Sequence, residues 1–205
     1  MSAPIQDSTH PPASAAPGET SWEGRAFGAI VLAAFLLYGI GSASPDQPIG
    51  MILVALNSIA VAYAGLIGFR LMRPSDPRVG LGYLTARVAE AALLAGGVVL
   101  AQHADVGEAD VTGYLLAMIA LGAGSIPFCR SLGRRRWIPQ PLATWGTYGY
   151  AALTIGALLE LATGRSVSVI LAVPGGLFEL VLGVYLVLYG FRRPATQALP
   201  ANRHQ

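Results

Sequence analysis

Three charged side chains lie inside long apolar stretches of this 205-residue chain, where they could carry out acid–base or binding chemistry. Arg87 and Glu90 stand three residues apart in YLTARVAEAALLAGGVVL (83–100), and Glu179 stands in LAVPGGLFELVLG (171–183). A charge inside a membrane costs about 2.5–3.5 kcal/mol even on the most lenient scale, so such residues face one another or a polar cavity. Arg87, Glu90 and Glu179 are therefore the candidate catalytic residues.

The spacing of these residues leaves three interpretations open. Residues three apart on a helix share a face, so Arg87 and Glu90 could form a structural ion pair that locks a helix bundle. Alternatively, Glu90 and Glu179 line a polar cavity, where Arg87 keeps one carboxyl ionised and the other takes up and releases a proton. In the third interpretation, Arg87 extends alone to the cytoplasmic surface.

Four further residues are candidates for binding a ligand. Asn57 reaches a similar depth in its own apolar segment, and Tyr83 lies one turn before Arg87 on the same helix face. Trp145, in TWGTYG, could belong to an aromatic belt at the cytoplasmic interface or line the mouth of a cavity. Arg136, in the basic loop GRRRW, could hold a phosphate or a lipid headgroup.

The elements that must position these residues are transmembrane helices. The chain is 54% hydrophobic and 12% charged, whereas soluble domains carry about 25% charged residues. A membrane span needs roughly 20 predominantly apolar residues. The sequence predicts an all-α polytopic membrane protein, a bundle of six transmembrane helices within residues 25–193, between disordered cytoplasmic tails at 1–24 and 194–205. The six expected spans are 26–44, 49–69, 81–103, 111–129, 142–164 and 168–191.

The arginines predict how this bundle is oriented. All thirteen basic residues are arginine, and eleven of them fall in the loops and tails of one side. Arg165 falls in a loop of the other side, and Arg87 falls within the membrane. Because loops rich in arginine and lysine stay in the cytoplasm, we expect both ends of the chain there.

Small residues predict which helices meet. Asn57, Glu90 and Glu179 each lie on a helix face that also carries glycine or alanine. Such residues mark close helix packing in membranes, because they let two backbones approach. We therefore expect the second, third and sixth helices to contact one another at these faces.

The remaining composition argues against several classes of protein. The chain has one cysteine, Cys129, and three histidines, of which His10 and His204 lie in the tails. We therefore expect no metal centre and no cofactor. The net charge of +2 is too small for a nucleic-acid footprint. The expected partners are membrane lipids, a lipophilic small molecule or a partner subunit in the membrane.

Three stretches carry a family resemblance: YLTARVAEAALLAGG, SIPFCRSLGRRRWIPQPLATWGTYGYAAL and LAVPGGLFELVLGVYLVLYGF. Over residues 25–193 the chain resembles the bacterial integral-membrane family catalogued as domain of unknown function 4386. The resemblance implies a six-helix bundle in the bacterial inner (cytoplasmic) membrane and no established activity. Family features are an arginine and a glutamate on the third helix, a basic residue and a proline before a Trp-Gly pair, and a glutamate in the last helix. They match Arg87 and Glu90, Arg136 to Pro139 with Trp145 and Gly146, and Glu179.

Three functions fit these observations. In the first, a buried Arg/Glu site binds or acts on a lipophilic ligand, a lipid or an isoprenoid, with one carboxyl as general acid in the enzymatic version. The second is a small proton-coupled transporter, since helices one to three and four to six each carry a glutamate on their third helix. The third is a non-catalytic membrane subunit or scaffold. No nucleophile–base pair is visible in the sequence, so the choice between enzyme and non-enzyme stays open.

Overall fold

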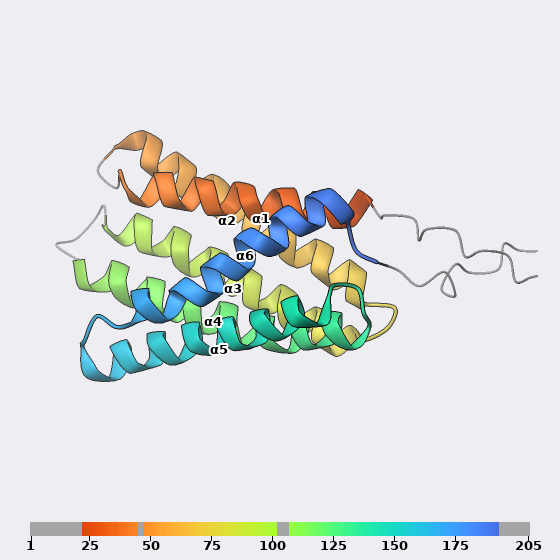
Figure 1. Ribbon diagram of the computed structural model, residues 1–205. Helices are drawn as coiled ribbons and strands as arrows, with labels where there is room; N and C mark the ends of the chain where they lie inside the picture. The colour runs from red at the N-terminus through yellow and green to blue at the C-terminus, as the bar shows by residue number, and fades with distance from the viewer. Residues whose placement is uncertain (1–21, 45–46, 102–106, 193–205) are drawn as a thin grey trace, which may run out of the picture.

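A computed structural model describes residues 22–44, 47–101 and 107–192, and over these residues the fold is entirely helical (Figure 1). This confirms the all-α prediction. The helices are α1 (Trp22–Ser42), α2 (Pro48–Met72), α3 (Pro77–Ala101), α4 (Gly107–Arg134), α5 (Gln140–Thr163) and α6 (Ser168–Tyr189).

Each helix overlaps the span expected from its apolar residues, but several helices extend beyond that span. α1 begins at Trp22, inside the stretch 1–24 that was expected to be a disordered tail. α4 runs on from the expected end at residue 129 to Arg134. A hydropathy window detects only the apolar part of a helix, whereas backbone hydrogen bonding continues into polar residues. The rest of both expected tails lies outside the described residues.

The six helices form a closed ring. Each helix packs against its neighbours in the sequence, and α6 completes the ring by packing against α1. As Figure 1 shows, α6 begins beside α5 at one end of the bundle and crosses obliquely to reach α1 at the other end. α1 therefore starts, and α6 stops, at the same end of the bundle.

This ring partly contradicts the packing expected from small residues. α2 and α3 are neighbours, as expected, but α6 packs mainly on α1 and α5. Gly183 of α6 faces Leu32 and the backbone of Gly28 in α1. The backbones of α6 and α3 do not pack closely. Instead, the side chain of Glu179 on α6 forms an ion pair with Arg87 on α3. Small residues identify a close-packed helix face but not the partner helix.

Aromatic side chains close the interior of the ring at the end where α1 begins. Tyr83 of α3 stacks on Phe128 of α4, with ring centroids 3.9 Å apart. Phe27 of α1 packs against both rings and against Phe191, which follows α6. We call these four residues the aromatic plug. Toward the other end, Tyr38 of α1 stacks on Tyr114 of α4 at 6.3 Å. The interior between these two aromatic contacts contains a cavity.

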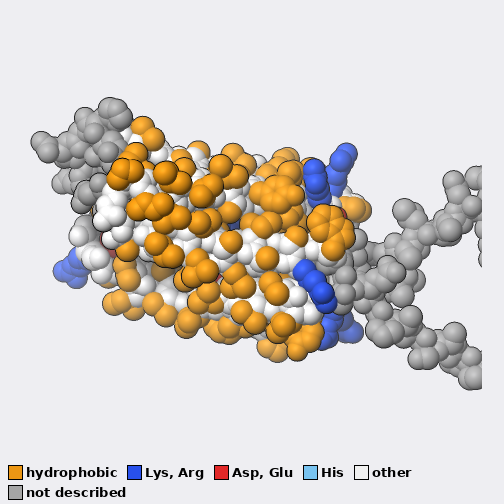
Figure 2. Space-filling view, turned by 90° about the horizontal axis from the view of Figure 1, so that it is seen from above, with side chains coloured by type: hydrophobic (Ala, Val, Ile, Leu, Met, Phe, Trp, Pro, Cys, Tyr) orange, Lys and Arg blue, Asp and Glu red, His pale blue; other side chains and the backbone are white. Residues whose placement is uncertain are grey.

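The outer surface is that of a membrane-embedded protein. Hydrophobic side chains cover the middle of the face in Figure 2, and basic side chains gather mostly at one end. Four described helices, α1, α2, α4 and α6, are long and apolar enough to cross a membrane. Arg165 lies at the end where α5 leads into α6. The described arginines at the opposite end are Arg25, Arg70, Arg73, Arg78, Arg130, Arg134, Arg135, Arg136 and Arg192.

Candidate functional site

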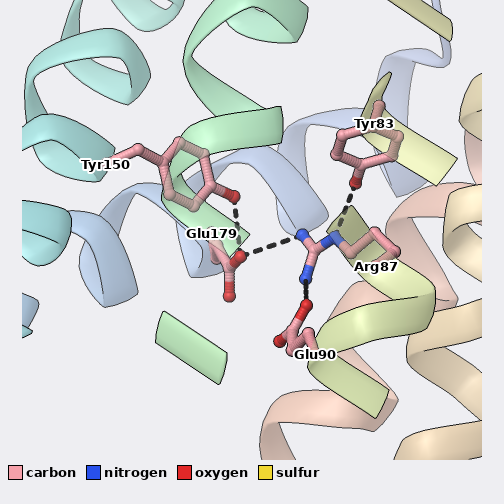
Figure 3. Close-up of polar contacts among 5 residues, drawn as sticks. All are labelled: Tyr83, Arg87, Glu90, Tyr150 and Glu179. Carbon is pink, nitrogen blue, oxygen red and sulfur yellow. Dashed lines mark hydrogen bonds and ion pairs between the residues drawn. The ribbon is translucent and has the colours of Figure 1, made fainter. Parts of the chain in front are cut away.

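Arg87 is the hub of a buried polar cluster (Figure 3). Its three guanidinium nitrogens each donate a hydrogen bond: Nε to the hydroxyl of Tyr83 at 3.0 Å, one terminal nitrogen to Glu90 at 2.9 Å, and the other to Glu179 at 3.1 Å. Tyr150 completes the cluster by donating its hydroxyl to Glu179 at 2.6 Å. We call these five residues the Arg87 cluster.

Local helix geometry places three members of the cluster on one element. Tyr83, Arg87 and Glu90 lie at i, i+4 and i+7 on α3, which puts them on one face of the helix. A glycine in α2 lets this face approach, since a Cβ at Gly65 would lie 2.7 Å from the Cβ of Arg87. Arg87 and Glu90 are then only 5% and 4% exposed. The other two members come from α5 and α6 and meet α3 across the interior.

A cavity of about 420 Å³ adjoins the cluster. All six helices contribute to its lining, which is mainly apolar. The charged residues among the described lining are Arg87, Glu90 and Glu179, and Asn57 of α2 adds a polar group that is almost fully buried. The volume is within the range of small-molecule sites, which are mostly apolar and contain a few well-placed polar groups.

The cavity opens sideways, between α1 and α6. Its exposed large side chains all belong to these two helices: Phe35 on α1, and Val169, Val173 and Leu177 on α6, which are 41–64% exposed. α1 and α6 pack closely near the end with the aromatic plug, where Gly28 meets Gly183. The opening therefore lies toward the end where Tyr38 and Tyr114 stack, and its rim is apolar.

The structure brings some of the sequence-predicted residues together and leaves others apart. Arg87, Glu90, Glu179 and Asn57 all line the cavity. Tyr83 bonds Arg87, but its ring belongs to the aromatic plug and lies outside the lining.

The other two candidates are not among the residues that line the cavity. Trp145 donates its indole N–H to the backbone oxygen of Pro174 at 3.1 Å and so ties α5 to α6. Arg136 lies in the loop between α4 and α5 with φ 56°, at the arginine-rich end of the bundle. The cavity lining includes neither of them.

Sequence reasoning missed Tyr150, which bonds Glu179 and lines the cavity. A usable signal was present, because a tyrosine in the middle of an apolar helix needs a partner for its hydroxyl. The same reasoning overlooked the wall formed by α4, where Tyr114, Met118 and Leu121 face the cavity. These residues look like ordinary apolar core in the sequence.

This geometry contains the contacts that two of the three interpretations of Arg87 and Glu90 require. The two residues form an ion pair, as the structural interpretation requires. Both carboxylates also line a cavity, as the second interpretation requires. The third is wrong: Arg87 does not extend to the surface, because Glu90 and Glu179 hold its guanidinium in the interior.

The fold and the site define the class: an all-helical, membrane-embedded protein in which a ring of helices surrounds an apolar cavity with a charged cluster in its wall. The chain belongs to the family described as Domain of unknown function (DUF4386), which matches residues 40–190. That range contains all five residues of the Arg87 cluster, and the match confirms the family resemblance. No curated protein and no solved structure matches the chain.

Proposed function

We propose that the protein binds a lipophilic small molecule, which enters the central cavity directly from the bilayer between α1 and α6. The cavity carries this proposal: its walls are apolar, its polar groups are concentrated in one cluster, and its rim consists of exposed apolar side chains. A ligand with an apolar body and one polar end matches this arrangement. An aqueous substrate does not, because it would have to cross the apolar rim.

The proposal places all six helices across the bacterial inner membrane with both ends of the chain in the cytoplasm. α3 and α5 have 25 and 24 residues, which is about 36–38 Å at 1.5 Å per residue, long enough to cross. The charges that lower the hydropathy of α3, Arg87 and Glu90, point inward, while its exposed residues from Leu81 to Val99 are uncharged. The arginine-rich end supports the orientation, and the family resemblance supports the bacterial membrane.

Cysteine labelling tests this orientation. In a Cys129→Ala background we expect Ser166→Cys to react with a membrane-impermeant maleimide added to intact cells, because this position lies in the loop between α5 and α6. Arg134→Cys, at the arginine-rich end, should react only after the cells are opened. Both positions are exposed in the folded protein, so a difference in labelling between them reports the side of the membrane and not burial. The reverse labelling pattern would show that the orientation is wrong.

A cavity-filling variant tests ligand binding. We expect protein purified in mild detergent to retain lipophilic molecules, detected by native mass spectrometry as bound adducts. Gly176→Leu combined with Ala172→Leu adds side chains one turn apart on α6 at positions that line the cavity, and should remove these adducts. The structure has room for a side chain at Gly176, because a Cβ there would lie 3.6 Å from its nearest neighbour, Phe35. Equal adducts in both proteins would indicate lipid on the outer surface, as expected for a scaffold.

A further inference from the structure

The charges around the cavity do not balance. Its described lining contains one guanidinium, Arg87, and two carboxyls, Glu90 and Glu179. With both carboxyls ionised the net charge is +1 − 2 = −1. An uncompensated charge away from water is costly, so the cluster requires one further positive charge. That charge is either a proton or a cationic group of a ligand.

Each carboxyl of the cluster has one oxygen left to accept a hydrogen bond. Glu179 Oε1 accepts from Arg87 and Tyr150, and Glu90 Oε2 accepts from Arg87. Among the described residues, nothing donates to the second oxygen of either carboxyl. All three guanidinium nitrogens already donate to protein oxygens, which uses three of the five guanidinium N–H groups. An ionised carboxylate only accepts hydrogen bonds, so these two free oxygens favour a ligand that donates.

The arginine-rich end does not supply an anion site for this cavity. Arg136 and its neighbours lie beyond the aromatic plug, in which Tyr83 and Phe128 stack at 3.9 Å. A phosphate or carboxylate in the cavity would therefore meet one cationic group among the described lining residues, Arg87, whose charge two carboxylates already offset. The electrostatics disfavour an anionic ligand and favour a cationic one.

We propose that the ligand's polar end is a protonated amine, held by the free oxygens of Glu90 and Glu179 while its apolar body extends toward the opening between α1 and α6. This inference rests on the proposed function and specifies its ligand class. The amine brings the site to neutrality, +2 − 2 = 0, and an ammonium offers three N–H donors. In the empty site a proton on one carboxyl gives the same neutrality. An uncharged amine arriving from the bilayer takes that proton, leaving an ammonium between two carboxylates.

Three probes with the same tail test this ligand class: decylamine, decanol and decanoate. Each is titrated against the full-length protein in detergent, with thermal stabilisation as the readout. The cavity-filled variant, Gly176→Leu with Ala172→Leu, measures the part of each effect that arises outside the cavity. We expect decylamine to bind about tenfold more tightly than decanol. Hydrogen bonds to charged groups contribute more free energy than hydrogen bonds between neutral groups, and the difference corresponds to about a tenfold change in affinity. Decanoate should show no cavity-dependent effect.

A charge variant and its control identify the groups responsible. Glu179→Gln leaves one guanidinium and one carboxylate, a neutral pair, so the preference for decylamine over decanol should disappear. Asp76→Asn removes a carboxylate outside the cavity and keeps a side chain able to cap Val79, so the preference should persist. Equal binding of decylamine and decanol, or strongest binding of decanoate, would overturn the amine assignment but retain a lipophilic site. If no probe distinguishes the wild type from the cavity-filled variant, the proposed function itself fails.

Discussion

Arg87→Ala is expected to destabilise the protein more than any other single side-chain truncation in the Arg87 cluster. The substitution leaves Glu90 and Glu179 facing each other in the interior without their shared cation. Removing one partner of a buried ion pair costs about 3–5 kcal/mol, and here one partner serves two carboxylates. The hydroxyl of Tyr83 also loses its donor. Thermal unfolding in detergent, monitored by circular dichroism, measures the effect.

The physical cause of this loss can be separated from simple truncation. Adding Glu90→Gln and Glu179→Gln to Arg87→Ala removes the uncompensated charges and should restore much of the unfolding temperature. Arg134→Ala, at an exposed arginine of the arginine-rich end, is the matched control and should change stability little. If Arg87→Ala unfolds at the wild-type temperature, the Arg87 cluster does not hold the bundle together.

Leucine substitutions at three glycines, two in the close α1–α6 contact and one in the cavity lining, should destabilise the fold to graded extents. A Cβ at Gly28 would lie 2.6 Å from the carbonyl oxygen of Gly183 and 3.0 Å from the backbone nitrogen of Val187. Two backbones would have to separate, so Gly28→Leu should exceed the roughly 1–3 kcal/mol typical of overpacking. The unfolding temperature of each variant in detergent measures the effect.

The other two glycines supply the internal comparison. A Cβ at Gly183 would lie 2.7 Å from a side-chain carbon of Leu32, which can rotate, so Gly183→Leu should cost less than Gly28→Leu. Gly176→Leu enters the cavity wall, where the nearest atom is 3.6 Å away, and should cost least. Equal unfolding temperatures for the three variants would contradict the close contact between α1 and α6 at Gly28 and Gly183.

Local patterns explain why part of the site was predictable. Arg87 and Glu90 stand three residues apart on one helix, so their pairing follows from helical periodicity alone. The partial burial of Glu179 also followed from its place in an apolar span, but its hydrogen bond to Arg87 joins residues 92 positions apart. The residue types of Trp145 and Arg136 favoured ligand binding, but neither residue is among those that line the cavity.

The sequence alone determined that the chain folds into long apolar helices, that its arginines gather at one end, and that Arg87 and Glu90 share a helix face. These properties depend on helix period and composition, which are local. Only the tertiary structure decided that the helices close into a ring, that α6 lies between α5 and α1, and that Tyr150 joins Glu179. The physical reason is that lipid tails are as apolar as leucine. Hydropathy therefore places a residue in the membrane without indicating whether it faces lipid, a neighbouring helix or the cavity.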